Sequence, residues 1–194
     1  QCTTLNLQRA TNYDCWKHWC QTNMSGATYY KFNMELPMLW VNLKEFDNDK
    51  LADIIISKGD VQNKETNVKA NMTGWRLDLE HEEVNTLANK AIELASDIRK
   101  SFSQIDYYTR SCWGASYTKG QYTDEHAHWP CLYSWCYYVK APKGSSPLIF
   151  TEGNIEFEPT EGDLIIFSSL VNHKVPRCEC EEPRVMIAGN IGVR

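Results

Sequence analysis

The second half of this sequence is a run of short strand-like segments, and this run constrains the fold more than any other feature. Eight pieces rich in β-branched and aromatic residues follow one another, separated by Gly, Pro and Ser. They cover residues 111–118, 122–128, 131–142, 147–152, 154–159, 163–167, 173–176 and 184–193. Many short strands at even spacing are typical of a sandwich or barrel, and eight favour a jelly roll. We predict a mainly β fold with a double-stranded β-helix core over residues 111–194.

The region before this core, residues 35–110, predicts one strand and the helices that support the core. Residues 35–43 are typical of a strand, and Asp47 is placed to cap a short helix that Gly59 ends. A longer helix is predicted over about residues 80–104, because apolar side chains recur three or four residues apart. Its apolar stripe comprises Val84, Leu87, Ala91, Ala95, Ile98 and Phe102. Since the stripe needs a covering surface, we expect the helices to pack on one face of the jelly roll.

The domain organisation follows from length and from the start of the chain. A chain of 194 residues is one domain by default. Residues 1–34 are polar and aromatic without any period, so we predict an N-terminal extension followed by a single domain over residues 35–194.

Charge and composition narrow the partners and the compartment. The net charge is −5 and no block of Lys or Arg exists, which argues against nucleic acid as a partner. No apolar run approaches the roughly 18 residues that cross a bilayer, so no membrane partner is expected. Most of the eight cysteines lie in apolar or aromatic runs, and no secretory signal is visible, so we predict reduced thiols in the cytoplasm. Cys178 and Cys180 form a Cys-x-Cys, but no second close pair completes a zinc site.

Two histidines, His126 and His128, alternate within a predicted strand. Residues i and i+2 of a strand point to the same side about 6.6 Å apart, so two such imidazoles can converge on one metal ion. Asp124 and His126 meet the same condition, whereas Asp124 and His128 would lie about 13 Å apart. His173 is the best-placed third ligand, since a barrel would return its strand beside the first. The residues alone leave metal ligands and hydrogen-bonded strand residues as alternatives.

The order of these residues resembles the prolyl-hydroxylase-like branch of the Fe(II)/2-oxoglutarate oxygenases. In that family a Tyr-x-x-Gly leads into His-x-Asp, as Tyr117-x-x-Gly120 leads here into His126-x-His128. Residues 136–139 resemble the tyrosine-containing strand that follows, and residues 157–175 resemble the Pro-x-x-Gly strand that leads to the distal histidine. The resemblance covers residues 111–194 and implies Fe(II) and 2-oxoglutarate as cofactors.

One departure from the family pattern affects the metal. The family's metal-binding aspartate falls on His128, so the nearest interpretation is a ligand set of His126, His128 and His173. Three neutral imidazoles leave one more positive charge than two imidazoles and a carboxylate, which should strengthen the hold on dianionic 2-oxoglutarate and weaken the hold on the metal. Asp124 is the alternative ligand, and Asp124 or Glu125 could instead orient an imidazole.

The resemblance also implies the cosubstrate residues and the reaction. Arg184 would bind the distal carboxylate of 2-oxoglutarate through its planar guanidinium, with Tyr138 and, less directly, Tyr117 as hydroxyl donors. The implied reaction couples oxidative decarboxylation of 2-oxoglutarate to hydroxylation of a small molecule or a protein side chain. Trp113, Trp129 and Trp135 are expected to wall the pocket or to fill the core.

Two other functions fit parts of the sequence. A cupin-type metal enzyme without 2-oxoglutarate would explain Gly120 and the His-x-His, but the glutamate that a cupin places after them is missing and Arg184 would have no role. A non-catalytic jelly-roll binding module would make the histidines incidental. An inactive descendant of the oxygenases is a further alternative, and the sequence does not choose the substrate or the oligomeric state.

Overall fold

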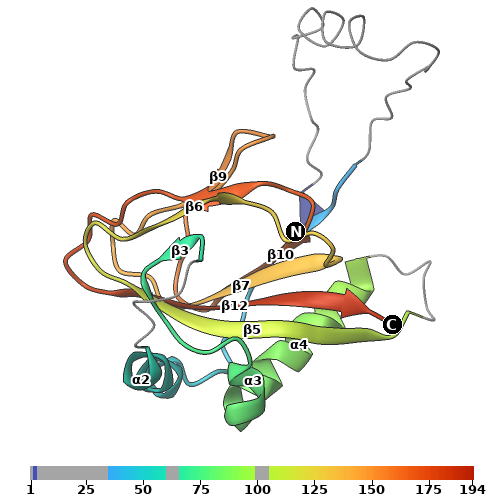
Figure 1. Ribbon diagram of the computed structural model, residues 1–194, viewed down its shortest axis with the longest axis horizontal. Coiled ribbons are helices and arrows are strands. Elements are labelled where there is room, and N and C mark those ends of the chain that lie inside the picture. Colours follow the sequence, from blue (N-terminus) through green and yellow to red (C-terminus); the bar gives the residue numbers. More distant parts are fainter. Residues whose placement is uncertain (1, 4–34, 60–65, 99–104) are drawn as a thin grey trace, which may run out of the picture.

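The computed structural model describes residues 2–3, 35–59, 66–98 and 105–194, which form two antiparallel sheets with helices outside the larger one (Figure 1). The larger sheet runs in the order β1 (Cys2–Thr3), β2 (Met38–Asn42), β10 (Asp163–Ser168), β7 (Tyr133–Lys140), β12 (Arg184–Val193), β5 (Tyr107–Tyr117) and β4 (Asn71–Met72). The smaller sheet runs in the order β3 (Val68–Lys69), β6 (Tyr122–His126), β11 (His173–Val175), β8 (Leu148–Phe150) and β9 (Ile155–Phe157).

The chain crosses between the two sheets as a jelly roll does. From β5 onward it alternates between the larger and the smaller sheet, except that β8 and β9 pair as a hairpin within the smaller one. Each of the eight segments predicted from the sequence is a strand, and the predicted mainly β fold is confirmed. The strand expected over residues 35–43 is the shorter β2.

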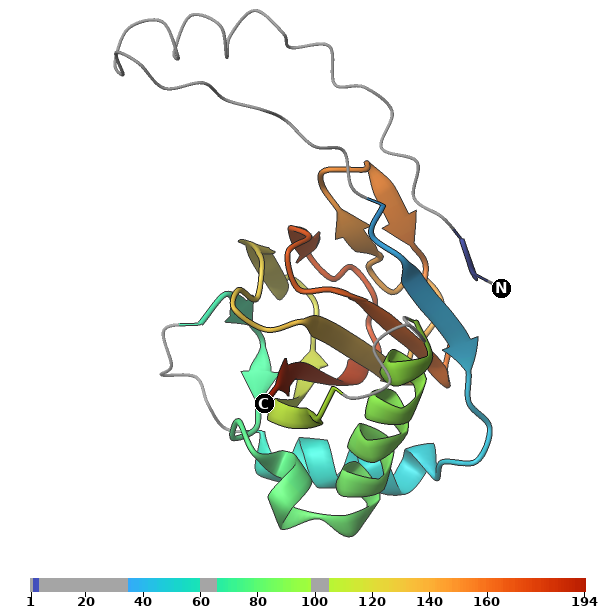
Figure 2. The same cartoon turned by 90° about the vertical axis from the view of Figure 1, so that its right-hand side faces the viewer.

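Helices cover the outer face of the larger sheet, as Figure 2 shows from the side. They are α2 (Asn48–Lys58), α3 (Leu77–Glu80) and α4 (Glu82–Ile98). The caps of α2 are as predicted: the Asp47 side chain accepts a hydrogen bond from the Lys50 backbone, and the N–H of Gly59 donates to Ile55. The long predicted helix starts later, because extended backbone at His81 separates α3 from α4. Its predicted end, residues 99–104 with Phe102, lies outside the described residues.

Two apolar layers result from this arrangement. The stripe on α4, with Val84, Leu87, Ala91 and Ala95 fully buried, packs with α2 against the outer face of the larger sheet. Burial of a Val or Leu side chain contributes roughly 1.5–3 kcal/mol, so this layer is a main source of stability. The α2 helix approaches so closely that a Cβ at Gly114 would lie 2.5 Å from the Ile55 side chain. The second apolar layer lies between the sheets and contains the candidate site.

The N-terminal extension and the membrane are the subjects of two further predictions. Most of the predicted N-terminal extension, residues 4–34, lies outside the described residues. Among the helices that are described, none combines the length and the apolar character that a bilayer crossing requires.

Candidate functional site

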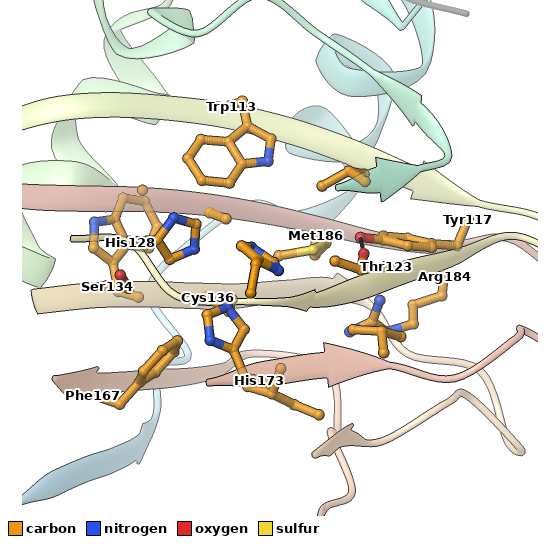
Figure 3. A pocket seen from close by; sticks show the side chains of 17 residues that line it. Trp113, Tyr117, Thr123, His128, Ser134, Cys136, Phe167, His173, Arg184 and Met186 are labelled. Carbon is orange, nitrogen blue, oxygen red and sulfur yellow. Dashed lines mark hydrogen bonds between the residues drawn. The ribbon is translucent and has the colours of Figure 1, made fainter. Parts of the chain in front are cut away.

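A pocket lies between the two sheets, with its floor on β5, β7 and β12. Figure 3 shows His128 and His173 toward one end of this pocket, Arg184 and Tyr117 toward the other, and Cys136 and Met186 between them. The two groups of residues that the sequence singled out therefore face one cavity from opposite ends.

The three predicted histidines gather at one end of the pocket. His126 ends β6, His173 begins β11, and the two are cross-strand partners. One ring nitrogen from each of His126, His128 and His173 lies within 4.8 Å of the others, and the ring centroids are 4.5–5.1 Å apart. Two nitrogens that share an ion through bonds of about 2.1 Å lie at most about 4.2 Å apart, so the three imidazoles could hold one ion after small side-chain shifts.

Backbone carbonyls orient two of these rings. Nδ1 of His126 lies 2.8 Å from the carbonyl oxygen of Asp124, and Nδ1 of His173 lies 3.0 Å from that of Val171. A carbonyl oxygen only accepts, so each neutral ring carries its proton on Nδ1 and keeps the Nε2 lone pair free. A metal-binding imidazole is usually oriented in this way, by a hydrogen bond from the ring nitrogen that does not bind the metal.

A bulge in β6 decides which of its residues enter the pocket. Thr123 pairs with Val175, and His126 pairs with His173. The chain therefore advances three residues on β6 but only two on β11 between these pairs. A bulge of this kind redirects side chains. Asp124 is turned outward: its carboxylate is half exposed and lies 3.8 Å from Nζ of Lys69. The expectation that Asp124 and His126 share a face, which rests on a regular strand, is therefore wrong for this segment.

His128 is held by a different device, because β6 ends two residues before it. Its N–H donates to the carbonyl of Ser169 at 2.9 Å, and its own carbonyl accepts from the N–H of Cys131 at 2.9 Å. The Ser169 hydroxyl lies 2.8 Å from that of Ser134, which donates to Oδ1 of Asn190 at 2.8 Å. A buried polar network thus anchors His128 from outside the strand ladder, and the prediction that both histidines belong to one strand is wrong for His128.

Burial keeps the three imidazoles neutral. It lowers the pKa of His126, lowers that of His128 to about 3 and lowers that of His173 to about 4, and the neighbouring imidazoles add to the last two shifts. A neutral imidazole is the form that binds a metal. The cluster is therefore ready to bind a cation at neutral pH.

The opposite end of the pocket presents a buried, unpaired cation. Arg184, the first residue of β12, is 1% exposed, and its guanidinium carbon lies 4.8 and 5.1 Å from the ring centres of Tyr117 and Tyr138. Its Nε and Nη1 have no hydrogen-bond partner among the described residues. A buried charge without a partner is costly, so this end of the pocket fits an anionic group that accepts hydrogen bonds from the guanidinium.

The two predicted tyrosines differ in what their hydroxyls do. The Tyr117 ring lines the pocket, but its hydroxyl is engaged with Oγ1 of Thr123 at 2.7 Å. The Tyr138 hydroxyl is buried and has no partner in the described part of the chain. Burial raises the pKa of both groups, so both stay protonated and able to donate. Of the two, Tyr138 keeps a free donor beside Arg184.

The three tryptophans separate into different environments. Trp113 lines the pocket, with its ring centre 6.1 Å from that of His128. Trp135 is fully buried and also belongs to the apolar layer under the helices. Trp129 is 75% exposed. Trp113 and Trp135 therefore both line the pocket, whereas Trp129 does not.

The network residues Ser134 and Asn190 were not singled out from the sequence, although a signal for them exists. Successive residues of a strand point to opposite faces. Counting back from Tyr138 in steps of two reaches Cys136 and Ser134, and counting forward from Arg184 reaches Asn190. Alternation from the assigned residues would therefore have placed these polar side chains on the pocket face.

Comparison with known proteins adds to this geometry through structure rather than sequence. No family model matches the chain, and no curated protein matches it. A collagen prolyl hydroxylase of Paramecium Bursaria Chlorella virus-1, in complex with 2-oxoglutarate, superposes with a TM-score of 0.64 at 20% identity, over 79% of this chain and 94% of that one. This chain therefore shares the fold of that hydroxylase, which is the fold of the 2-oxoglutarate and Fe(II) oxygenases.

Further structures with this oxygenase fold agree. A Pseudomonas putida prolyl-4-hydroxylase matches with a TM-score of 0.59 at 18% identity, over 80% of this chain and 92% of that one. HygX from Streptomyces hygroscopicus, with nickel, 2-oxoglutarate and hygromycin B bound, matches with a TM-score of 0.59 at 10% identity, over 80% and 82% of the two chains. The oxygenase fold inferred from the order of short sequence motifs is confirmed.

The residues present fit both groups that the oxygenase fold implies. One ring nitrogen from each of three histidines lies at one end, and unpartnered guanidinium and phenol donors lie at the other. One feature is unusual: the histidine cluster contains no carboxylate among the described residues.

Proposed function

We propose that this chain is a non-haem iron oxygenase that couples oxidative decarboxylation of 2-oxoglutarate to hydroxylation of a substrate. The observation that carries the proposal is the pairing of two features across one cavity. A cluster of neutral imidazoles faces a buried, unpaired arginine, and the cavity between them is lined mainly by apolar side chains. A cupin-type enzyme without 2-oxoglutarate, or a binding module, would leave the buried charge of Arg184 without a partner.

His126, His128 and His173 would hold the iron through nitrogen atoms. Three imidazole ligands leave positions open for other groups, as the usual facial set of two histidines and a carboxylate does. Arg184 would pair with the distal carboxylate of 2-oxoglutarate, and the Tyr138 hydroxyl would donate to the same group. When bound, iron and 2-oxoglutarate together supply the oxidation of a C–H bond by dioxygen, with succinate and carbon dioxide as coproducts.

The remaining pocket residues position the reactants and exclude water. Trp113, Phe167 and Met186 line the cavity with apolar surface, which strengthens the electrostatic contacts made inside it. The bulge in β6 positions His126, and the hydrogen-bond network behind His128 positions that residue separately. The neutral ligand set leaves the full charge of the metal uncompensated, which favours a dianionic cosubstrate.

The test is an anaerobic titration of the purified chain with Fe(II) and 2-oxoglutarate, followed by visible absorbance. We expect a metal-to-ligand charge-transfer band that saturates at one equivalent of each and is absent from the His173→Ala variant. Full iron binding without any band on addition of 2-oxoglutarate would favour the cupin-type alternative. Less than a tenth of an equivalent of bound iron would favour the binding module.

We propose a small molecule or a protein side chain as the substrate. The structural neighbours include prolyl hydroxylases and an enzyme with hygromycin B bound, so both classes have precedent on this fold. We also propose that residues 35–194 form one domain preceded by an extension, and that the protein works in a reducing compartment such as the cytoplasm. Five cysteines of the described residues are free thiols, which supports that compartment.

A further inference from the structure

Two cysteines in the connection between β11 and β12 have no part in the proposed reaction. Sγ of Cys178 and Sγ of Cys180 lie 2.9 Å apart, and both residues are free thiols. A disulfide has an S–S bond of about 2.05 Å, so the two sulfur atoms would need to approach by only about 0.9 Å.

The backbone holds this pair in place. The N–H of Cys178 donates to the carbonyl of Gln121 at 2.7 Å, and its own carbonyl accepts from the N–H of Gly120 at 2.7 Å. The adjacent Arg177 donates to the carbonyl of Gly120 at 2.8 Å and stacks over the Tyr122 ring at 4.3 Å. The short distance between the sulfur atoms thus belongs to a segment anchored on the turn between β5 and β6. Positioning of this kind favours closure of a disulfide once one of the two sulfur atoms has been oxidised.

The surroundings select the oxidant and the order of attack. Cys180 is 9% exposed and Cys178 is 2% exposed, so a reagent from solvent meets Cys180 first. Glu179 and Glu182 are exposed in the same segment and repel anionic reagents such as glutathione disulfide, whereas Glu181 is paired with Lys119. Hydrogen peroxide is small and uncharged. Burial, followed by the hydrogen bond with Cys180, raises the pKa of Cys178, which keeps this second thiol neutral and slow to react with solvent oxidants.

We propose that Cys178 and Cys180 are a redox-active dithiol that hydrogen peroxide converts reversibly into a disulfide. In the first step the sulfur of Cys180 attacks peroxide: an S–O bond forms, the O–O bond breaks, and one water leaves. In the second step the sulfur of Cys178 attacks the resulting sulfenic acid: the S–S bond forms, the S–O bond breaks, and a second water leaves. Two thiols and one peroxide therefore give one disulfide and two waters, and a small dithiol reverses the change.

The position of the pair gives the modification a consequence for the pocket. The connection that carries it runs from the strand of His173 to Arg184, and Cys178 packs in the same intersheet cluster as Tyr117 and Tyr138. A disulfide would stiffen the segment that joins the two ends of the proposed site.

Peptide mass analysis of the full chain tests the proposal. Trypsin cleaves after Arg177 and after Arg184, which releases residues 178–184 with both cysteines of the pair and no other. After treatment with peroxide, alkylation and digestion, we expect this peptide to be about 2 Da lighter than the dithiol and free of alkyl groups. Dithiothreitol before alkylation should restore two alkyl groups.

Variants make the assignment specific. Cys178→Ser and Cys180→Ser should each abolish the mass loss, and two variants are used because either one alone could fail to fold. Cys131→Ser, which removes a buried thiol elsewhere, should leave the mass loss intact. The proposal is overturned if the peptide still takes two alkyl groups after peroxide, or if it only gains oxygen. None of these readouts depends on iron or 2-oxoglutarate, so failure here is distinct from failure of the proposed function.

Discussion

Replacing Arg184 by Met should separate cosubstrate binding from stability. The guanidinium is 1% exposed, and its Nε and Nη1 have no partner among the described residues. A hydrogen bond to a charged group contributes about 1.5–3 kcal/mol, so loss of one such bond to a carboxylate should cost about 2–3 kcal/mol. That loss corresponds to a rise of about 30- to 150-fold in the Kd for 2-oxoglutarate.

The same substitution should stabilise the protein in the absence of cosubstrate. A buried charge without a partner costs several kcal/mol, and the contacts with the Tyr117 and Tyr138 rings, about 2 kcal/mol each when desolvated, return only part of this. Methionine fills a similar volume without charge, so we expect a gain of about 1 kcal/mol, or about 2–4 °C in Tm for a domain of this size.

Calorimetry measures both effects on the same samples. Titration of 2-oxoglutarate into Mn(II)-loaded protein gives the Kd, and a thermal scan of the ligand-free protein gives the Tm. Arg110→Met, on the exposed side of β5, is the matched control and should change neither. A Kd within threefold of the parent value would refute the role of Arg184, and a lower Tm would refute the argument from its unpaired charge.

Three further outcomes are expected. His173→Ala should lose iron in equilibrium dialysis, since it removes one of three converging nitrogens; retention of a full equivalent would contradict the ligand set. The pKa values of His128 and His173, about 3 and about 4 against 6.5 for an exposed imidazole, mean that the unfolded chain takes up protons below pH 6.5 that the folded, metal-free protein does not. The free energy of unfolding of the metal-free protein should therefore fall as the pH drops from 6.5 toward 4. Each histidine contributes at most ~1.4 kcal/mol per pH unit to this fall. Urea denaturation that shows no fall over this pH range would contradict the prediction. Gly162→Ala should lower the free energy of unfolding by about 1–3 kcal/mol more than Gly144→Ala in the same assay. Both glycines have a positive φ, but only at Gly162 would a Cβ meet backbone, 2.8 Å from the carbonyl oxygen of Leu43.

Features with a local cause were predictable from the sequence. The caps of α2 depend on Asp47, Gly59 and their immediate neighbours, and the eight strands depend on local composition and turn residues. The meeting of His126 with His173 needed one further step, the closure of a jelly roll, which the order of the motifs supplied.

Features that depend on a partner strand were not predictable in this way. The bulge that turns Asp124 outward exists because β6 pairs with β11 over unequal numbers of residues. The departure of His128 from the strand depends on a hydrogen bond to Ser169, some forty positions later in the chain. Neither contact has a local signature, since each is decided by which backbone groups the rest of the fold brings near.

The placement of His128 outside both sheets has a consequence for how this site can change. Residue 128 belongs to no strand. Its backbone is anchored by hydrogen bonds to Ser169 and Cys131, and a network of Ser134, Ser169 and Asn190 lies behind it. An imidazole and a carboxylate can thus be exchanged at residue 128 while the ladder beneath stays the same, so one scaffold can accommodate metal sites of different net charge.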